Sequence, residues 1–545
     1  MAYINSFKDQ NWLIPQSIKD MIPSNHICFF IEQFVESLDF SGFDLINEGP
    51  GHPAYHPRIV MKVLLQGMLS GERSSRKLSR ACRENFVFMY LAEKVNPDFR
   101  TFCRFRRQNA SFIKETFKET VNLASKNDLI DLSLICTDGT MMSANANKKK
   151  SLKREHFEKL DEVIEKMIAD DIEQDEIDEK FEKEENLTNM DKRDFKRLVS
   201  EYRRVKDKKK LKKKFENVKK ELKKNPEVKK VSLTDPESRM MQNKKRITES
   251  SYNVQFSVSK NQIILANDVC QDGHDVDQLI PQVEMVKENV ELPNGVKFSA
   301  DCGYSSGDNY KFLEDEKLDG FIPSRSQAQK LDGKEESLNH DNYEFDEKKN
   351  ELIVEGVRFQ FRGSYVRKNG RKILTFYNKK LKKKKDIPFY FRARLRMKVK
   401  METDEGRMVY GVRNETVEPV IGNVKENLGL RGFRLRGLEG GRIELDLVSA
   451  AHNLGKIWRM GGRVRVVGKK IVLGGGVGRK EKEFGLDGDV GGKNIVFWFV
   501  VFSWNLIVRR PPLLNAPTTK GRRVQRGSER SGESSEVGVS RAKPN

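Results

Sequence analysis

Hydrophobic residues in the first quarter of the chain recur every three or four positions, as they do on the buried face of an α-helix. This spacing runs from Pro57 to about Lys126 and predicts several short helices. The apolar residues that show it include Val60, Val63, Leu64, Met68, Leu78, Cys82, Phe86, Met89 and Tyr90. We therefore expect an all-helical region at the start of the chain.

Strand patterns follow. The short apolar run from Leu129 to Cys136 is bounded by Asp-Gly, which predicts a buried strand that ends in a turn. After Ser251 the segments "YNVQFSVS", "QIILANDV" and "GVKFSADCGY" predict three more strands, with one helix between the last two. Asp138 and Asp301 each stand where one of these strands is expected to end. Helices combined with such strands predict an α/β fold.

The segment between these strands, residues 150–230, has two long amphipathic patterns. The part from Glu155 to Asn186 holds 15 acidic and 4 basic residues, whereas the part from Asp191 to Lys224 holds 17 basic and 6 acidic residues. An antiparallel helical hairpin would place the acidic arm beside the basic arm, each pair adding a few tenths of a kcal/mol. A single solvated charged helix is the alternative.

The last third of the chain predicts a small strand-rich insertion around 340–380 and a charged helix from about Ala393 to Gly406. Farther on, Val417, Ile421, Val424 and Leu428 recur at four, three and four, which predicts another helix with Pro419 in its first turn. From Gly461 to Gly492, 11 of 32 residues are glycine, so we expect little stable structure there.

The net charge of the chain indicates what kind of partner it binds. The chain has 545 residues and a formal net charge of +22, which favours a polyanion, with nucleic acid as the first candidate. A basic protein without such a partner is the plainer alternative. The predicted N-terminal helices carry basic residues interleaved with aromatics, as in a DNA-binding unit or a solvated basic face. The residues we select there as DNA contacts are Arg73, Arg76, Lys77, Arg80, Arg104 and Arg107.

Cysteines and apolar runs restrict the class further. The six cysteines form no Cys-x-x-Cys pair, so we expect neither a disulfide framework nor a clustered zinc site. The N-terminus has no secretory signal pattern, and the longest apolar run, Ile495 to Val508, is shorter than a bilayer span. We expect a cytoplasmic protein without a membrane partner.

Three carboxylates are the candidate chemistry. Side chains at two strand ends of an open sheet can converge, which brings Asp138 and Asp301 together, and Glu418 is expected on the helix that contains Pro419. Three hard oxygen donors with no His or Cys suit two Mg²⁺ or Mn²⁺ ions, which promote phosphoryl transfer. Lys425 is two helical turns after Glu418 and projects from nearly the same side.

A second pair of phosphate-compatible residues precedes Glu418. Tyr410 and Arg413 are three positions apart and so are neighbours on a helix. His274 and His452 could be read as metal ligands, but a capping or packed histidine is the better interpretation.

The segments "TDGT", "SADCGYSS" and "YGVRNETVEPVIGNVKENLGLRGFRLRGLE" resemble the three acidic motifs of bacterial insertion-sequence transposases of the DDE class. The segments "RSSRKLSRACRENFVFMYLA" and "PDFRTFCRFR" resemble the N-terminal helical part of the same family, and "DPESRMM" and "SYNVQFSV" resemble its central part. The likeness covers roughly Met1 to Met460, and the last motif is its most specific part.

This resemblance implies a ribonuclease H-like mixed sheet flanked by helices, with an N-terminal helical domain and a long helical-hairpin insertion. The boundaries we expect are 1–126 for the N-terminal DNA-binding domain, 127–149, 231–330 and 401–460 for parts of the catalytic domain, 150–230 for the charged hairpin, 331–400 for the strand-rich insertion and 461–545 for the glycine-rich tail.

The resemblance also implies an activity: metal-dependent DNA cleavage and strand transfer at the terminal inverted repeats of an insertion sequence, by a nucleoid-associated homodimer. Asp138, Asp301 and Glu418 would be the metal-binding triad, and Tyr410, Arg413 and Lys425 would contact the DNA. Four residues separate Arg413 from Glu418, whereas some relatives have three, which makes Glu415 the rival acid. Only Glu418 keeps six residues before Lys425.

Two departures from the family pattern leave alternatives. Many relatives have a small cysteine cluster before the last motif, whereas this chain has no cysteine after Cys302. The glycine-rich stretch after Met460 resembles nothing in the family and reads as an out-of-frame extension. The alternatives are therefore an inactive or domesticated DNA-binding derivative and a structure-specific nuclease on the same fold.

Overall fold

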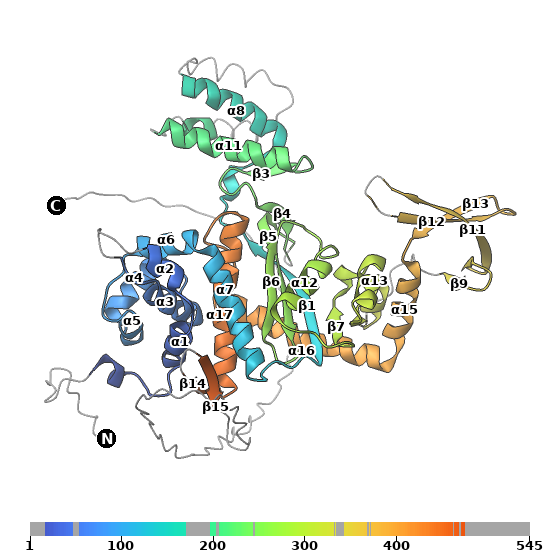
Figure 1. Cartoon of the computed structure of the whole chain (residues 1–545). Coiled ribbons are helices and arrows are strands. Elements are labelled where there is room, and N and C mark those ends of the chain that lie inside the picture. Colours follow the sequence, from blue (N-terminus) through green and yellow to red (C-terminus); the bar gives the residue numbers. More distant parts are fainter. Residues whose placement is uncertain are drawn as a thin grey trace, which may run out of the picture. The chain divides into compact units, whose positions relative to one another are not determined.

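The computed structural model describes residues 17–46, 54–169, 197–202, 207–243, 246–331, 333, 343–367, 370, 372–461, 463–467 and 470–474 (Figure 1). Contacts divide the chain into two units, Met1–Glu481 and Lys482–Asn545, and every described residue belongs to the first. The apolar run at 495–508 therefore lies outside the described residues. Within them, none of the helices has the length and apolar character needed to cross a membrane.

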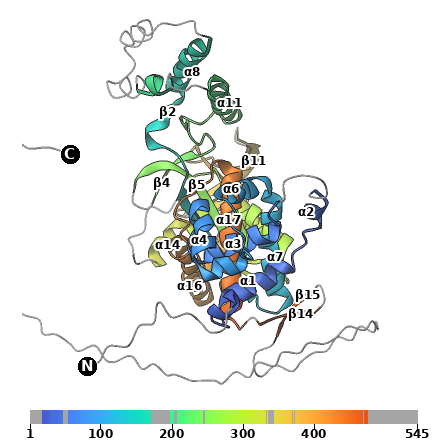
Figure 2. The ribbon, with the colours of Figure 1, turned by 90° about the vertical axis from the view of Figure 1, so that its left-hand side faces the viewer.

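Short helices make up the N-terminal part, as the spacing of apolar residues predicts. They are η1 (Ile18–Met21), α1 (Ile27–Glu36), α2 (Ser41–Ile46), α3 (Pro57–Leu69), α4 (Ser75–Glu84), α5 (Phe86–Leu91), α6 (Phe99–Gln108) and α7 (Ala110–Lys126). Helix α3 is buried along most of its length, and both α3 and α7 pack against α17 (Gly437–Arg459), as Figure 2 shows for α3 and α17. The N-terminal helices consequently share one hydrophobic core with the rest of the fold.

A mixed sheet forms the centre of that core. Its strands are β1 (Leu134–Ser143), β4 (Arg239–Gln242), β5 (Thr248–Ser259), β6 (Ile264–Cys270), β7 (Lys297–Ala300) and β8 (Asp319–Phe321). The order is β4-β5-β1-β7-β8, and β6 also pairs with β5. Strand β1 is antiparallel to β5 and parallel to β7, and β7 is parallel to β8. The predicted α/β class is confirmed in this coarse sense.

The structure differs from the expectation that β1 ends at Asp138. Strand β1 continues to Ser143, and Gly139 is paired with Gln255 of β5. Pairing with β7, in contrast, stops after Thr137. Asp138 therefore lies inside β1, at the point where its parallel neighbour ends. The Asp-Gly pair suggested a turn, but its glycine has a packing role that is described below.

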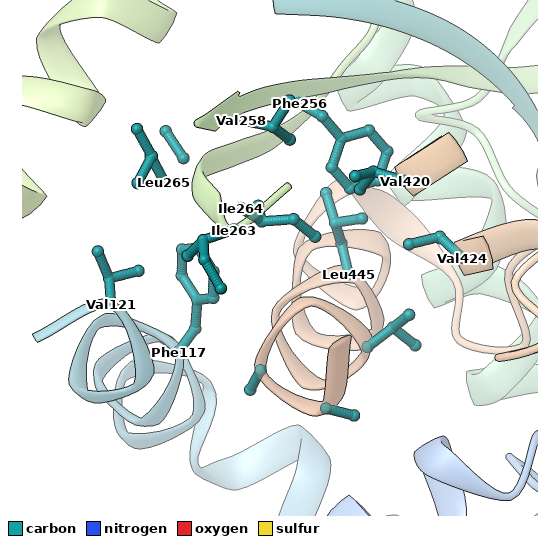
Figure 3. Packing of buried hydrophobic residues seen from close by; sticks show 14 of the residues in the cluster. Phe117, Val121, Phe256, Val258, Ile263, Ile264, Leu265, Val420, Val424 and Leu445 are labelled. Carbon is teal, nitrogen blue, oxygen red and sulfur yellow. The ribbon is translucent and has the colours of Figure 1, made fainter. Parts of the chain in front are cut away.

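Helices cover the sheet. They are α12 (Leu279–Asn289), α13 (Gly307–Asp315), α14 (Arg325–Leu331), α15 (Phe391–Glu402), α16 (Asp404–Glu426) and α17, with the short η3 (Cys302–Tyr304) after β7. Figure 3 shows how α16 and α17 pack on β5: Phe256 and Val258 face Val420, Val424 and Leu445. All five side chains are completely buried. Burial of this kind stabilises the fold by about 1.5–3 kcal/mol for each large apolar side chain.

Helix α16 corrects the expected position of Pro419. The helix begins at Asp404, where Thr403 caps it, so Pro419 lies in its interior and not in its first turn. A proline there leaves the carbonyl four residues earlier, that of Glu415, without its helical donor. The Gln262 side chain supplies the replacement, because its Nε2 donates to the Glu415 carbonyl oxygen at 2.9 Å. The helix therefore continues through the proline to the residues near Lys425.

The charged segment has an apolar core of its own. Helices α8 (Arg154–Ala169) and α11 (Lys208–Lys224) pack together beside the strands β2 (Ser151–Lys153) and β3 (Lys230–Ser232), with η2 (Lys148–Lys150) preceding β2. Apolar side chains of both helices, among them Phe157 and Phe215, are buried. Charge pairing between the two helices, as far as they are described, is through Lys219, which contacts Asp161 and Glu165 at 2.7 and 2.5 Å.

A second, antiparallel sheet forms the predicted strand-rich insertion. It has the order β13-β12-β11-β10-β9, formed by β9 (Glu344–Asp346), β10 (Glu351–Val354), β11 (Val357–Val366), β12 (Lys372–Asn378) and β13 (Lys383–Pro388). The glycine-rich region differs in part from the expectation of little structure, because β14 (Arg463–Val467) and β15 (Lys470–Gly474) form a hairpin. The rest of that tail, 475–545, lies outside the described residues.

Candidate active site

Asp138 and Asp301 belong to neighbouring strands. Thr137 of β1 is paired with Ala300 of β7, so the two aspartates follow a matched pair in a parallel ladder. Asp301 then leaves the sheet and caps η3, because its Oδ1 accepts a hydrogen bond from the Gly303 N–H at 2.8 Å. The two aspartates consequently lie together at the carboxyl end of β7, and the charge of Asp301 acts on Asp138.

Arg413 of α16 is the cation of this site. Its guanidinium is 7% exposed, and its Nη1 donates to Oδ2 of Asp138 at 3.2 Å. Nη2 is 4.0 Å from Oε1 of Glu418 and donates to Oδ1 of Asn414 at 2.9 Å. The guanidinium also lies over the ring of Tyr410, 5.3 Å from the ring centroid. One arginine therefore joins the strand aspartate to the helix glutamate.

Asp301, the third carboxylate, acts on Asp138 and Arg413 through its charge. Burial raises the pKa of the Asp138 carboxyl to about 6. Arg413 opposes the rise, while the negative charges of Asp301 and Asp275 add to it. Burial alone would lower the pKa of Arg413, but the charges of Asp138, Asp301 and other nearby acids raise it. The site therefore holds more negative charge than its arginine neutralises.

The helix α16 carries the remaining predicted residues. Glu418 is exposed and lies within reach of Arg413, whereas the backbone carbonyl of Glu415 accepts a hydrogen bond from Gln262. Lys425 donates through its Nζ to Oγ1 of Thr140, two residues after Asp138 on β1. The structure thus brings Tyr410, Arg413, Glu418 and Lys425 to the side of α16 that meets β1.

No three Asp, Glu, His or Cys side chains among the described residues are placed so that they could hold a metal ion directly. The donor set nevertheless suits a hard cation, because it consists of carboxylate oxygens and because Arg413 already brings a positive charge against Asp138. Magnesium keeps several of its waters and needs only one or two carboxylates in direct contact. The residues present therefore fit a hydrated divalent cation.

A fourth carboxylate near the site was missed by the sequence reasoning. Asp275 lies in the loop between β6 and α12, in "QDGHDVDQ", and its charge acts on Asp138. Its Oδ1 accepts hydrogen bonds from Asn253 and Gln255 of β5, each at 2.7 Å. The only sequence signal was a pair of amides at alternate positions of a buried strand, where apolar residues are the rule.

The arginines of the N-terminal helices fall into two groups. Arg76, Lys77, Arg80, Arg104 and Arg107, on α4 and α6, are exposed. For Arg73 the structure differs from the expectation, since the residue is 2% exposed and its guanidinium donates to the carbonyls of Gly429 and Gly432. It also pairs with the buried Glu444. All of these partners are inside the protein, so Arg73 joins two parts of the fold and is not placed to meet DNA.

His452 is packed, as we interpreted it. Its ring accepts a hydrogen bond from Asn423 and donates one to the Gln262 carbonyl, both at 2.9 Å. Burial lowers the pKa of His452 to about 4, so the ring is neutral near pH 7. His274 is exposed. The six cysteines are all free thiols.

Comparisons with known families agree with this geometry. A family model described as a transposase domain (DUF772) matches residues 16–108, the N-terminal helices. A model described as a transposase DDE domain matches residues 374–458, which include α16 with Arg413 and Glu418. Asp138 and Asp301 lie outside both matches. No curated protein matches the chain. The two matches confirm the resemblance to insertion-sequence transposases of the DDE class.

Proposed function

We propose that the chain cleaves DNA at the ends of its own insertion sequence and joins those ends to a target, using two divalent cations. The observation that carries this proposal is the meeting of Asp138, on β1, with Arg413 and Glu418, on α16, beside Asp301 at the end of β7. The two strands and the helix are far apart in the sequence. Their acidic residues gather around one arginine, and converging carboxylates are the groups that hold Mg²⁺ in phosphoryl-transfer sites.

The sheet order supports a ribonuclease H-like core for this activity. Neighbouring strands are antiparallel from β6 through β5 to β1, and β7 and β8 then continue in parallel with β1. The helices α16 and α17 follow and pack against the sheet. We infer from this order that 127–149, 231–330 and 401–460 form one catalytic domain, with 150–230 and 331–400 as insertions.

In the proposed site, Asp138, Asp301 and Glu418 hold Mg²⁺ or Mn²⁺. When bound, such cations activate the attacking hydroxyl and stabilise the leaving oxygen. The chain's own residues then have separate tasks. Arg413 moves between the carboxylates and a DNA phosphate, and Lys425, fixed beside β1 by Thr140, binds a second phosphate. Tyr410 supports the guanidinium by lying under it.

DNA recognition is assigned to the exposed cations of α4 and α6. Arg76 is held over the Phe99 ring at 5.0 Å, which links the first residues of the two helices. Helix α4 packs on α6, so Arg80, Arg104 and Arg107 belong to the same helical pair. We propose that this pair binds the terminal inverted repeats and that two copies of the chain join two ends. Such a homodimer would act in the cytoplasm, at the nucleoid.

The test uses a plasmid that carries the DNA flanking the gene on both sides, incubated with the full chain and Mg²⁺. We expect nicking and strand joining at the element ends, and we expect Asp301→Ala to lose both while it still binds the ends. Binding without cleavage in the unmodified chain would favour the inactive derivative. Cleavage without joining would favour the structure-specific nuclease.

A further inference from the structure

Asp275 is held in one orientation by residues that belong to the core. Asn253 and Gln255, its two donors, are both fully buried on β5. Gln255 is itself fixed, because its Oε1 accepts a hydrogen bond from the buried Tyr304, next to the Asp301 turn. Both amides donate to the same oxygen, Oδ1. A carboxylate restrained in this way is pre-organised, and its second oxygen has a defined direction.

Two glycines make room for this carboxylate. A Cβ atom on Gly139 would overlap Oδ1 of Asp275 and would also lie 2.6 Å from Nε2 of Gln255. Gly139 follows Asp138 directly. At Gly303, two residues after Asp301, a Cβ atom would be 3.4 Å from Oδ2 of Asp275 and 2.9 Å from Oδ1 of Asp301. Gly139 thus lets Asp275 pack against β1. The carboxylates of Asp275 and Asp301 both border the space beside Gly303.

The second oxygen, Oδ2, therefore lies on the side of Gly303, two residues after Asp301. Among the described residues it has no hydrogen-bond donor, whereas Oδ1 has two. A further polar atom in the same group is also unused: Oδ1 of Asn253 is buried and has no partner in the described part of the chain. Buried polar atoms without a partner are uncommon and indicate a missing water or ion.

A positively charged group already lies next to this carboxylate cluster. The guanidinium of Arg413 lies against Asp138, and the charge of Asp301 acts on it as well. We propose that Asp275 is a fourth carboxylate of this site and that, together with Asp301, it holds a hydrated divalent cation. The inference rests on the proposed function, and it adds a ligand that the three acidic motifs do not contain.

The experiment measures binding of Mn²⁺ alone to the full chain without DNA, by electron paramagnetic resonance. In Asp275→Asn the amide oxygen still accepts both hydrogen bonds, so the charge is lost while the packing is kept. We expect the affinity for Mn²⁺ to fall about 10–100-fold. The matched control is Asp277→Asn, because Asp277 is an exposed residue of the same loop, and we expect its affinity to equal that of the unmodified chain.

A second measurement covers the case in which Asp275→Asn is less stable. The rise in melting temperature on adding Mn²⁺ reports binding to the folded state, and we expect a smaller rise than in the control. Equal affinity and an equal rise in the two variants would overturn the inference. Asp138→Asn separates this failure from a wider one: if it also binds Mn²⁺ normally, the proposed function fails, whereas if it alone loses binding, only the role of Asp275 fails.

Discussion

Two buried arginines, Arg73 and Arg413, each meet a carboxylate, but their surroundings differ. Arg73 pairs with Glu444, which is completely buried and whose Oε1 also accepts hydrogen bonds from the backbone of Arg434 and Leu435. The charged residues themselves, Arg73 and Glu444, are 2% and 0% exposed. Water and phosphate have no access to the pair, so its role is to join α17 to the N-terminal helices.

Arg413 is buried to a similar degree, yet one of its acidic partners is open to solvent. Glu418 has an exposed side chain and is 4.0 Å away, whereas Asp138 is largely buried where β7 ends. A charge pair of this kind can exchange partners when a cation or a phosphate arrives. The comparison teaches that burial of an arginine does not identify its role, whereas the accessibility of its acidic partner does.

The largest change in the free energy of unfolding is expected from the buried pair of Arg73 and Glu444. Arg73→Ala leaves Glu444 buried without its cation, which should lower the free energy of unfolding by about 3–5 kcal/mol. Urea unfolding followed by circular dichroism measures this change. Arg76→Ala, an exposed arginine nearby, should stay within about 0.5 kcal/mol of the unmodified chain. Similar stabilities for the two variants would remove the distinction between the arginines.

Asp446, two residues after Glu444, provides the next test because no cation forms a salt bridge with it among the described residues. Burial raises the pKa of Asp446 to about 7, well above its usual 3.8. The folded state therefore binds the proton more tightly than the unfolded state, and this contribution to stability is lost as pH rises from about 4 to 7. The loss should approach about 4 kcal/mol.

Asp446→Asn should remove this dependence and make the chain more stable above pH 7. The measurement is urea unfolding at several pH values, with the variant curve subtracted from that of the unmodified chain. His452, whose pKa is lowered to about 4, contributes in the opposite direction between pH 4 and 6.5, but it does so in both proteins and cancels. A flat difference curve would show that Asp446 is ionised at no cost.

Substitution of Arg413 should change the free energy of unfolding less than substitution of Arg73, but it should change the affinity for Mn²⁺. Arg413→Gln loses a charged hydrogen bond to Asp138, which should cost about 1–3 kcal/mol. At the same time a competing positive charge leaves the carboxylates, so Mn²⁺ should bind the DNA-free chain more tightly. Calorimetric titration measures the affinity, with Arg407→Gln on the same helix as the control. Weaker Mn²⁺ binding in Arg413→Gln would mean that the arginine organises the carboxylates and does not compete with the cation.

The exposed arginines should affect stability least. Changing Arg76, Arg80, Arg104 and Arg107 together to Gln should leave the unfolding free energy within about 0.5 kcal/mol for each position. The affinity for duplex DNA should fall, and the slope of log affinity against log salt should become shallower by roughly 3 to 4, as for four lost phosphate contacts. The control changes the exposed Lys348 and Lys349 in the second sheet. An unchanged slope would place the DNA elsewhere.

Sequence patterns predicted the parts of the site that depend on local order. Apolar runs located the strands before Asp138 and Asp301, and helical spacing placed Arg413 and Glu418 on one helix. The boundaries were less accurate for physical reasons. Asp-Gly usually marks a turn, but Gly139 stays in the strand because Asp275 occupies the space that a side chain would take. Proline is usually found in the first turn of a helix, but Pro419 lies inside α16. The side chain of Gln262 replaces the N–H that the proline lacks.

Contacts between distant segments could not be predicted in this way. The burial of Arg73 depends on Glu444, and the two residues are 371 positions apart in the sequence. Asp275 stands in a polar loop that looks like any other acidic loop until β5 supplies its two amides. Residues whose role depends on a partner from another element carry no local pattern, which is why Arg73 was assigned to DNA and Asp275 was overlooked.

Gln262 uses both ends of its amide: it donates to the Glu415 carbonyl and accepts from Nζ of Lys456 at 2.7 Å. Few amino acids can replace it, because a glutamate cannot donate and a lysine cannot accept. Pro419 and Gln262 should therefore occur together in related transposases. Relatives without this proline should tolerate other residues at the position of Gln262. A substitution of Gln262, in the turn between β5 and β6, would then first disturb helix α16 at Glu415 and the neighbouring Glu418.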